Sequence, residues 1–190
     1  RRLDKEDPGL RWLLENTIGD DTGDNISERN GSYNEMTSVY WAWKNYDELG
    51  DPDYIGFMHY RRHFLFRDGE PSVSEVNTLG ADADYLSSAL GYSREALDDL
   101  LSSCDFVYAK PQKRNSMREH FELNHHLPDL ELALAILREK FPEFADAADH
   151  YLAGSDAIFC NMVIFPKSLF QRYAEFVFGV LLEVEERGAL

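Results

Sequence analysis

Four residues that can do chemistry, His59-Tyr60-Arg61-Arg62, directly follow a short apolar run. Such a run ending abruptly in charge is typical of a buried central strand that delivers residues to a site. Arginine holds phosphate oxygens through paired, charge-assisted hydrogen bonds. Because side chains alternate along a strand, His59 and Arg61 should face one side, and Tyr60 and Arg62 the other. An ion pair between one arginine and the acids of residues 20–24 explains the cluster equally well.

A loop rich in Gly and Asp carries Asp20, Asp21 and Asp24. Hard divalent cations prefer carboxylate oxygens, so these aspartates could ligate one. Their spacing favours an ordinary Asx-type turn instead.

Two adjacent histidines, His125 and His126, lie close to Asp129. They could be metal ligands or an acid/base pair. Adjacent side chains diverge on a helix, which disfavours a metal shared by both histidines. We therefore expect one of them to be structural.

Trp41, Trp43 and Asn161 are candidates for contacts with a sugar. A tryptophan ring could stack on a sugar, but Trp43 lies on an apolar helical stripe and fits a core position better. Asn161 is a lone polar residue in an apolar run. If buried, it needs hydrogen-bond partners, either in a structural network or on a ligand hydroxyl.

Short apolar runs that alternate with helical patterns predict an α/β fold with a mainly parallel sheet, as one domain over residues 1–190. In such sheets ligands collect beyond the carboxyl ends of the strands. A Ser32–Glu35 capping box is expected to open the first of the helices. The predicted elements are loops over 8–31 and 68–93 (the second an insertion), helices over 33–47, 94–103, 116–124, 130–140, 142–152 and 168–187, and strands over 54–60, 105–111 and 158–165.

The formal charge of −16 argues against nucleic acid as a partner. Residues 59–67 and 110–118 nevertheless form two basic islands that hold seven of the 19 Lys and Arg and no acid. They suggest a focused site for a small anion. The two cysteines fit neither a zinc site nor a disulfide framework, and neither a membrane-spanning run nor an export signal occurs, so we expect a cytoplasmic protein.

The sequence carries an ordered set of motifs over most of residues 17–185, namely Asp21 to Ser27, Asn30, Glu35, Thr37, Tyr40 to Asn45, Asp53 to Gly56, His59 to Arg62, Asn124 to His126, Asp129-Leu130, Asn161-Met162, Lys167, Phe170 and Tyr173. This set resembles the bacterial capsular and exopolysaccharide glycosyltransferases, a family long known only as a domain of unknown function. The resemblance implies a GT-A-like fold and transfer of a sugar, plausibly galactose in pyranose or furanose form, from a nucleotide donor to a polysaccharide or lipid-linked acceptor. Family members usually begin with a further strand, which we expect this sequence to lack.

The resemblance also implies roles for particular residues. Where many GT-A enzymes hold a divalent metal with Asp-x-Asp, this sequence has His59-x-Arg61. Arg61 and Arg62 would then neutralise the leaving diphosphate without a metal, and His59 would orient or protonate it. Manganese or magnesium is the less favoured alternative. The other implied residues are Asp21, Asp24 and Asn25 for the donor, Trp41 and Asn161 for the acceptor, and His125, His126 and Asp129 for catalysis, with Glu35 a weaker candidate base.

Two further hypotheses remain open at this point. The chain could be a non-catalytic domain that binds a carbohydrate or a partner transferase. A metal hydrolase built from the His and Asp residues is the third, but no ligand pair has a compelling spacing. For the transferase, peripheral association with a membrane assembly complex at the inner face of the cell membrane is a further expectation.

Overall fold

A computed structural model describes residues 8–59, 62–66, 88 and 90–188. Contacts between residues divide the chain into two compact units. Unit 1 comprises Arg1–Pro52 and Gln171–Leu190, and unit 2 comprises Asp53–Phe170. The predicted insertion at 68–93 lies mostly outside the described residues.

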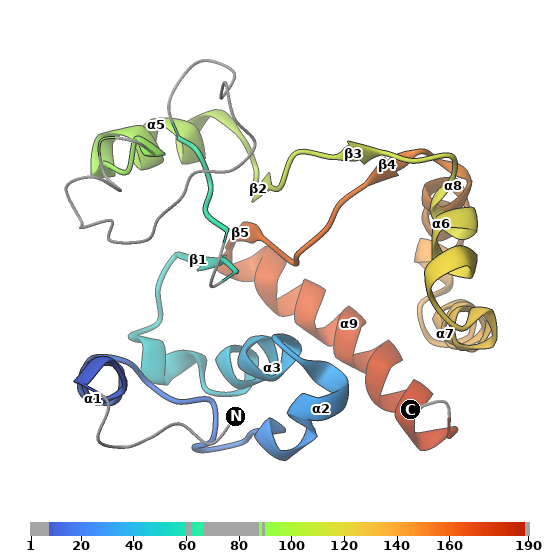
Figure 1. The fold of residues 1–190 in the computed structure, drawn as a ribbon, viewed down its shortest axis with the longest axis horizontal. Helices are drawn as coiled ribbons and strands as arrows, with labels where there is room; N and C mark the ends of the chain where they lie inside the picture. Colours follow the sequence, from blue (N-terminus) through green and yellow to red (C-terminus); the bar gives the residue numbers. More distant parts are fainter. Residues whose placement is uncertain (1–7, 60–61, 67–87, 89, 189–190) are drawn as a thin grey trace. The chain divides into compact units, whose positions relative to one another are not determined.

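Unit 1 is helical in its described part (Figure 1). The predicted loop over 8–31 is corrected at both ends, because residues 8–16 and 27–31 are helical. Between these helices the turn-forming composition of residues 19–25 does give turns and bends. The elements of unit 1 are α1 (Pro8–Asn16), η1 (Ser27–Arg29), α2 (Asn30–Tyr33), α3 (Met36–Lys44), η2 (Tyr46–Leu49) and most of α9 (Lys167–Glu186).

The predicted helix over 33–47 is interrupted at Asn34, whose φ of 49° is left-handed. Asparagine adopts this conformation more readily than most residues because its short polar side chain can bond locally. The predicted capping box is wrong, because Ser32 lies inside α2 and the N-cap of α3, Glu35, makes no side-chain cap bond. The chain therefore turns between two short helices.

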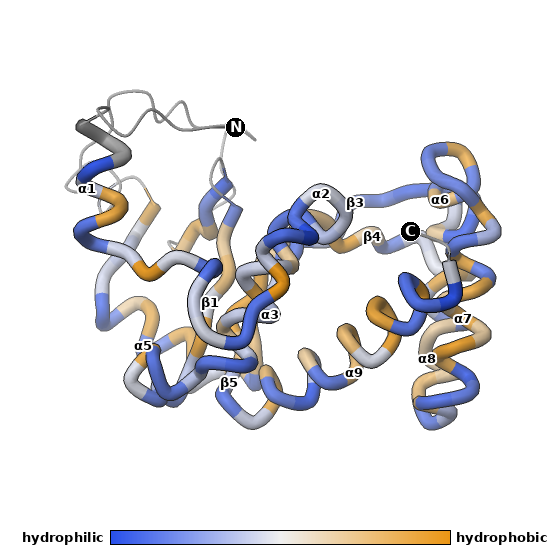
Figure 2. The backbone as a smooth tube through the Cα atoms, turned by 90° about the horizontal axis from the view of Figure 1, so that it is seen from below, coloured by the Kyte–Doolittle hydropathy of each residue, from blue (hydrophilic) through white to orange (hydrophobic). Residues whose placement is uncertain are grey.

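Aromatic packing forms the core of unit 1. The ring of Phe178, on α9, lies 5.1 Å from Tyr40 in an edge-on arrangement and 5.7 Å from Trp43 in a stacked one. Figure 2 shows apolar and polar residues alternating along α9, as expected for a helix with one buried face. The predicted core position of Trp43 is met only in part, because Trp43 stacks on Phe178 but is half-buried.

The main sheet of unit 2 has the order β1-β5-β2, with β1 (Tyr54–Phe57), β5 (Val163–Pro166) and β2 (Val107–Tyr108). Both pairings are antiparallel, with Tyr54 opposite Pro166 and Tyr108 opposite Val163. The prediction of a mainly parallel sheet is not met among the described strands, and β1 is an edge strand rather than a central one. An apolar run indicates burial but does not encode strand direction, and for that reason the sequence misled here.

The predicted strand over 158–165 is confirmed only for residues 163–165, because β5 begins at Val163. The short strand β4 (Asp156–Ala157), which pairs with β3 (Gln112–Lys113), lies before the predicted range. Between β4 and β5, Cys160 and Asn161 have φ values of 77° and 48°. Two consecutive left-handed residues end the extended conformation and make a turn.

The predicted helices of unit 2 are confirmed: α5 (Arg94–Ser103), α6 (Met117–Asn124), α7 (Leu127–Lys140) and α8 (Ala145–Ala153), with the short η3 (Pro142–Phe144) before α8. Serine caps two of them, since Ser93 Oγ accepts from Ala96 N and Ser116 Oγ from Glu119 N, each at 3.0 Å. Helices α6, α7 and α8 pack together (Figure 1). Among the described residues, no helix is long and apolar enough to cross a membrane.

Candidate functional site

The end of β1 brings His59 and Arg62 together. Arg62 N donates to His59 O at 3.1 Å, and the side-chain atoms Arg62 Nη1 and His59 Nδ1 are 3.4 Å apart. A guanidinium can only donate, so His59 Nδ1 accepts and the ring proton is on Nε2. The imidazole is then an Nε2–H donor beside a cation, an arrangement suited to a phosphate oxygen. Tyr60 and Arg61 lie outside the described residues.

Arg62 is exposed and forms no ion pair with the described carboxylates of unit 2. Next to it, His63 has a buried Nδ1 atom without a hydrogen-bond partner among the described residues. An unpaired buried polar atom lowers folding stability by about 1–3 kcal/mol. We therefore expect His63 Nδ1 to have a hydrogen-bond partner other than the described residues. His63 was not among the residues predicted from the sequence, although it directly follows the Arg pair.

A mainly apolar cavity of about 610 Å³ adjoins the same strand. Met58, the residue before His59, lines it, and the Met58 sulfur accepts a hydrogen bond from the Tyr92 hydroxyl at 3.3 Å. A volume of this size suits a small-molecule site. The other lining residues are Gly56, Phe64, Phe66, Ser93, Arg94, Leu97, Asp98 and Ile164.

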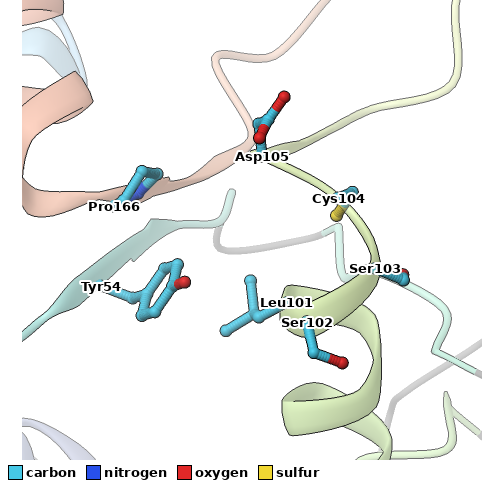
Figure 3. Close-up of a pocket in the computed structure, with 7 residues that line it drawn as sticks. All are labelled: Tyr54, Leu101, Ser102, Ser103, Cys104, Asp105 and Pro166. Carbon is cyan, nitrogen blue, oxygen red and sulfur yellow. The ribbon is translucent and has the colours of Figure 1, made fainter.

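A second cavity, of about 420 Å³, lies where β1 begins and β5 and α5 end. Figure 3 shows the Tyr54 ring pointing from β1 towards Leu101 of α5. The hydroxyls of Ser102 and Ser103 donate to the carbonyl oxygens of Asp99 and Leu100 in α5, each at 2.8 Å, so both hydroxyl protons are already used within the helix. No predicted site residue is among the residues that line it, namely Tyr54, Leu101, Ser102, Ser103, Cys104, Asp105 and Pro166.

In unit 1 the loop of predicted donor residues is held by Asn45. The Asn45 Oδ1 atom accepts from Asp24 N at 3.2 Å, and Asn45 Nδ2 donates to Asp24 O and Trp41 O, both at 2.9 Å. Gly23 has a φ of 55°, and a Cβ there would lie 2.1 Å from Asn45 Oδ1. Only glycine therefore fits this close approach.

The helix α3 supplies two further supports for the loop. Trp41 Nε1 donates to Thr22 O at 2.9 Å, and Tyr40 OH donates to Asp24 Oδ1 at 3.2 Å. Burial, and next the charge of Asp24, raise the pKa of Tyr40, so its hydroxyl stays a donor. Trp41 is only 5% exposed. Its observed role is to position the loop, and its ring has little surface left for the predicted stacking on a sugar.

The carboxylate of Asp20 binds the first turn of α3. Asp20 Oδ2 accepts from Thr37 Oγ1 at 2.7 Å and from Ser38 Oγ at 3.1 Å, and Thr37 is 1% exposed. A negative charge near a helix N-terminus is stabilising. Asp20 is thus a structural residue of this loop.

The predicted donor residues of this loop differ in their hydrogen bonds and exposure. Asn25 bonds within it, since Nδ2 donates to Gly23 O at 3.0 Å and Oδ1 accepts from Ser27 Oγ at 3.0 Å, as expected of an Asx-type turn. Asp21 and Asp24 are exposed. In the described part of the chain, no group of three or more His, Cys, Asp or Glu side chains could hold a metal ion.

At the start of α7, His126 and Asp129 form the predicted pair. His126 Nδ1 and Asp129 Oδ1 are 2.9 Å apart, and both side chains are accessible. A carboxylate on Nδ1 fixes the tautomer whose Nε2 can take a proton, as a general base needs. His125 instead packs its ring against Phe121, with 4.8 Å between the ring centroids. The expectation that one of the two histidines is structural agrees with this packing.

The predicted site residues fall in both units. Asp21, Asp24, Asn25 and Trp41 belong to unit 1, whereas His59, Arg62, His125, His126, Asp129 and Asn161 belong to unit 2. Asn161 is exposed on its left-handed turn rather than buried within a strand. No separate role was predicted for Asn45, although Asn45 stands in the motif that carries the resemblance and its amide supports the whole loop.

Comparison with known proteins relates this fold to glycosyltransferases. A solved structure described as the WbbM bifunctional glycosyltransferase in its apo form is similar with a TM-score of 0.76 and 32% sequence identity. The similarity covers 90% of the chain but only 31% of the WbbM chain. No curated protein matches the sequence. The family profile described as Domain of unknown function (DUF4422) matches residues 11–190, and the chain belongs to that family.

Proposed function

We propose that this chain is a glycosyltransferase domain that moves a sugar from a nucleotide-diphosphate donor to a glycan acceptor. The observation that carries the proposal is the similarity to a bifunctional glycosyltransferase over 90% of the chain. The chain spans 31% of the length of that protein. The pairing of His59 with Arg62 supports a site for the donor phosphates.

In the proposed reaction, an acceptor hydroxyl oxygen attacks the anomeric carbon of the donor sugar. The bond from that carbon to the diphosphate oxygen breaks, and the diphosphate leaves with the electron pair. Arg62, with Arg61, would neutralise this charge, and the His59 Nε2–H would donate to a phosphate oxygen. His126, oriented by Asp129, would take the hydroxyl proton.

The finer parts of the proposal concern the substrates. We take the donor sugar to be galactose, in pyranose or furanose form, and the acceptor to be a capsular or exopolysaccharide chain, free or lipid-linked at the inner face of the membrane. The reaction proceeds without a metal, because Arg61 and Arg62 would supply the positive charge that neutralises the leaving diphosphate. Asp21, Asp24 and Asn25 are proposed donor contacts of unit 1, held ready by Asn45 and Trp41.

A thermal-shift screen of nucleoside diphosphates, followed by turnover of the matching nucleotide sugar, tests the proposal. A ligand at 100 times its Kd adds about 2.7 kcal/mol of stability, so the preferred nucleotide should raise Tm clearly. Release of the nucleoside diphosphate should continue in excess EDTA. Loss of turnover in EDTA with rescue by manganese would contradict the metal-free mechanism. Carbohydrate binding without turnover on any nucleotide sugar would contradict the enzyme itself and support a binding domain.

A further inference from the structure

The second basic island, residues 110–118, has no part in the proposed transfer step. Two of its cations are used in ion pairs: Lys113 Nζ lies 2.6 Å from Asp156 Oδ1, and Arg118 pairs with Glu131. Arg114 differs from them, because no described carboxylate pairs with it. Its side chain donates to two neutral acceptors, the Lys113 carbonyl oxygen at 2.8 Å and Gln112 Oε1 at 2.9 Å.

An arginine side chain has five N–H donors. These two hydrogen bonds leave three donors of Arg114 without an acceptor among the described residues. The backbone at this position is fixed as well, since Arg114 N donates to Ser155 O at 2.8 Å. The Arg114 guanidinium, which keeps three N–H donors that the described residues do not use, thus projects from a backbone position that a hydrogen bond fixes at the end of β3.

The Phe159 ring lies against this guanidinium, and His120 in turn packs against Phe159. The central carbon of the guanidinium lies 5.1 Å from the Phe159 ring centroid, and the His120 ring meets Phe159 at 5.5 Å with a 63° interplanar angle. All three side chains are half-buried. Stacking on an aromatic ring orients the planar guanidinium, and it leaves the edge of the fork for an oxyanion.

The backbone directly after Phe159 is strained. Cys160 has a φ of 77° and Asn161 a φ of 48°. The left-handed conformation of Cys160 costs about 1–3 kcal/mol, whereas asparagine adopts it more readily. Strained residues cluster at ligand sites, where the surrounding structure holds them. The turn presents the exposed Asn161 two residues from Phe159, and Asn161 is already a predicted acceptor residue.

We propose that Arg114, His120 and Phe159 form a subsite for an anionic sugar residue of the acceptor glycan. Arg114 would hold the carboxylate or phosphate group through its fork, and His120 would add a ring N–H. An acidic glycan is repelled by a chain of formal charge −16, so a fixed, unpaired cation is what its recognition requires. This inference rests on the proposed function, because it assigns the acceptor of that reaction.

Binding of matched charged and neutral sugars to the whole chain tests the subsite. The probes are methyl glucuronide against methyl glucoside, and glucose 6-phosphate against glucose, each titrated by NMR. The wild type should bind at least one charged probe about tenfold more tightly than its neutral partner. Preference for the carboxylate, the phosphate or both identifies the source of the oxyanion. Arg114→Gln should abolish the preference, and Arg114→Lys should keep only part of it, because lysine retains the charge without the fork.

The control variant is Arg138→Gln, which removes an exposed arginine that pairs with Asp149 at 2.6 Å. It should bind all four sugars like the wild type. Equal affinity of the wild type for charged and neutral sugars, or an unchanged preference in Arg114→Gln, would overturn the subsite. Binding of UDP is measured in parallel and should be equal in all variants. Weaker UDP binding by Arg114→Gln would show that Arg114 belongs to the donor site and not to an acceptor subsite. Failure of the wild type to bind any nucleotide would count against the proposed function.

Discussion

Asn45 holds both polar backbone groups of Asp24, accepting from the Asp24 N–H at 3.2 Å and donating to the Asp24 carbonyl at 2.9 Å. We therefore expect Asn45→Ala to lower the free energy of unfolding by about 1–3 kcal/mol, because the backbone groups of Asp24 lose their partners. Urea denaturation measures the change. Asn124→Ala, which removes an exposed amide bonded to His120 O, is the matched control and should change stability by less than about 0.5 kcal/mol. Equal effects of both substitutions would show that the loop is not held in this way.

Gly23→Ala tests the same contact from the other side. A Cβ at this position would lie 2.1 Å from Asn45 Oδ1, and the backbone φ is 55°. The substitution should cost at least about 2 kcal/mol, since it adds left-handed strain and displaces the Asn45 amide. Gly31→Ala is the control: nothing lies within 4 Å of its Cβ, so stability should stay level or rise slightly. A Tm of Gly23→Ala equal to that of Gly31→Ala would contradict the predicted clash.

Tyr33 should make the stability of the chain sensitive to alkaline pH. Burial, and next its hydrogen bond to Glu185, raise the pKa of Tyr33 to about 12, above the ordinary value of 10.0. The unfolded chain then loses the phenol proton first, so the stabilising contribution is present below pH 10 and is lost as pH rises towards 12. Tyr33→Phe should flatten the fall of the urea midpoint between these pH values. Tyr54→Phe, at a residue that is 41% exposed, should leave the fall unchanged.

The pair of His126 and Asp129 should behave as one catalytic unit. If His126 is the base, His126→Gln should lower kcat by about 10²–10⁴-fold with little change in KM. Asp129→Asn should lower kcat as well, because the Nδ1 partner sets the tautomer. The double variant should be no worse than His126→Gln alone, since both act through one proton transfer. Fully additive losses of kcat in the double variant, or an equal loss of kcat in the exposed control His150→Gln, would show that the two residues do not act together as the catalytic base.

Local patterns predicted much of the fold. The local patterns of residues 94–103, 116–124 and 168–187 predicted the helices α5, α6 and α9. These signals lie within a few residues of one another, so short-range physics decides them. Strand direction was not predictable in the same way. It depends on partners such as Ile55 and Phe165, which are more than 100 residues apart in the chain.

The candidate site shows the same division. The residue types of His126 and Asp129, three positions apart, predicted a pair that the structure does bring together at 2.9 Å. The hydrogen bond between Asn45 and Asp24 joins residues 21 positions apart, and no short sequence motif predicted it. Trp41 was expected to meet a sugar because of its residue type, but its burial follows from tertiary packing, which the type does not specify.

The most direct test of the donor site is calorimetric titration of UDP, or of the nucleotide that the screen selects, in EDTA. Arg62→Ala should weaken binding about 10- to 100-fold, because it removes a charge-assisted bond to the diphosphate. The Arg138→Ala control should bind like the wild type, as its arginine is paired with Asp149. We expect only the Arg62 variant to lose affinity. Unchanged affinity in Arg62→Ala, or binding that requires a divalent metal, would contradict a metal-free donor site at Arg62.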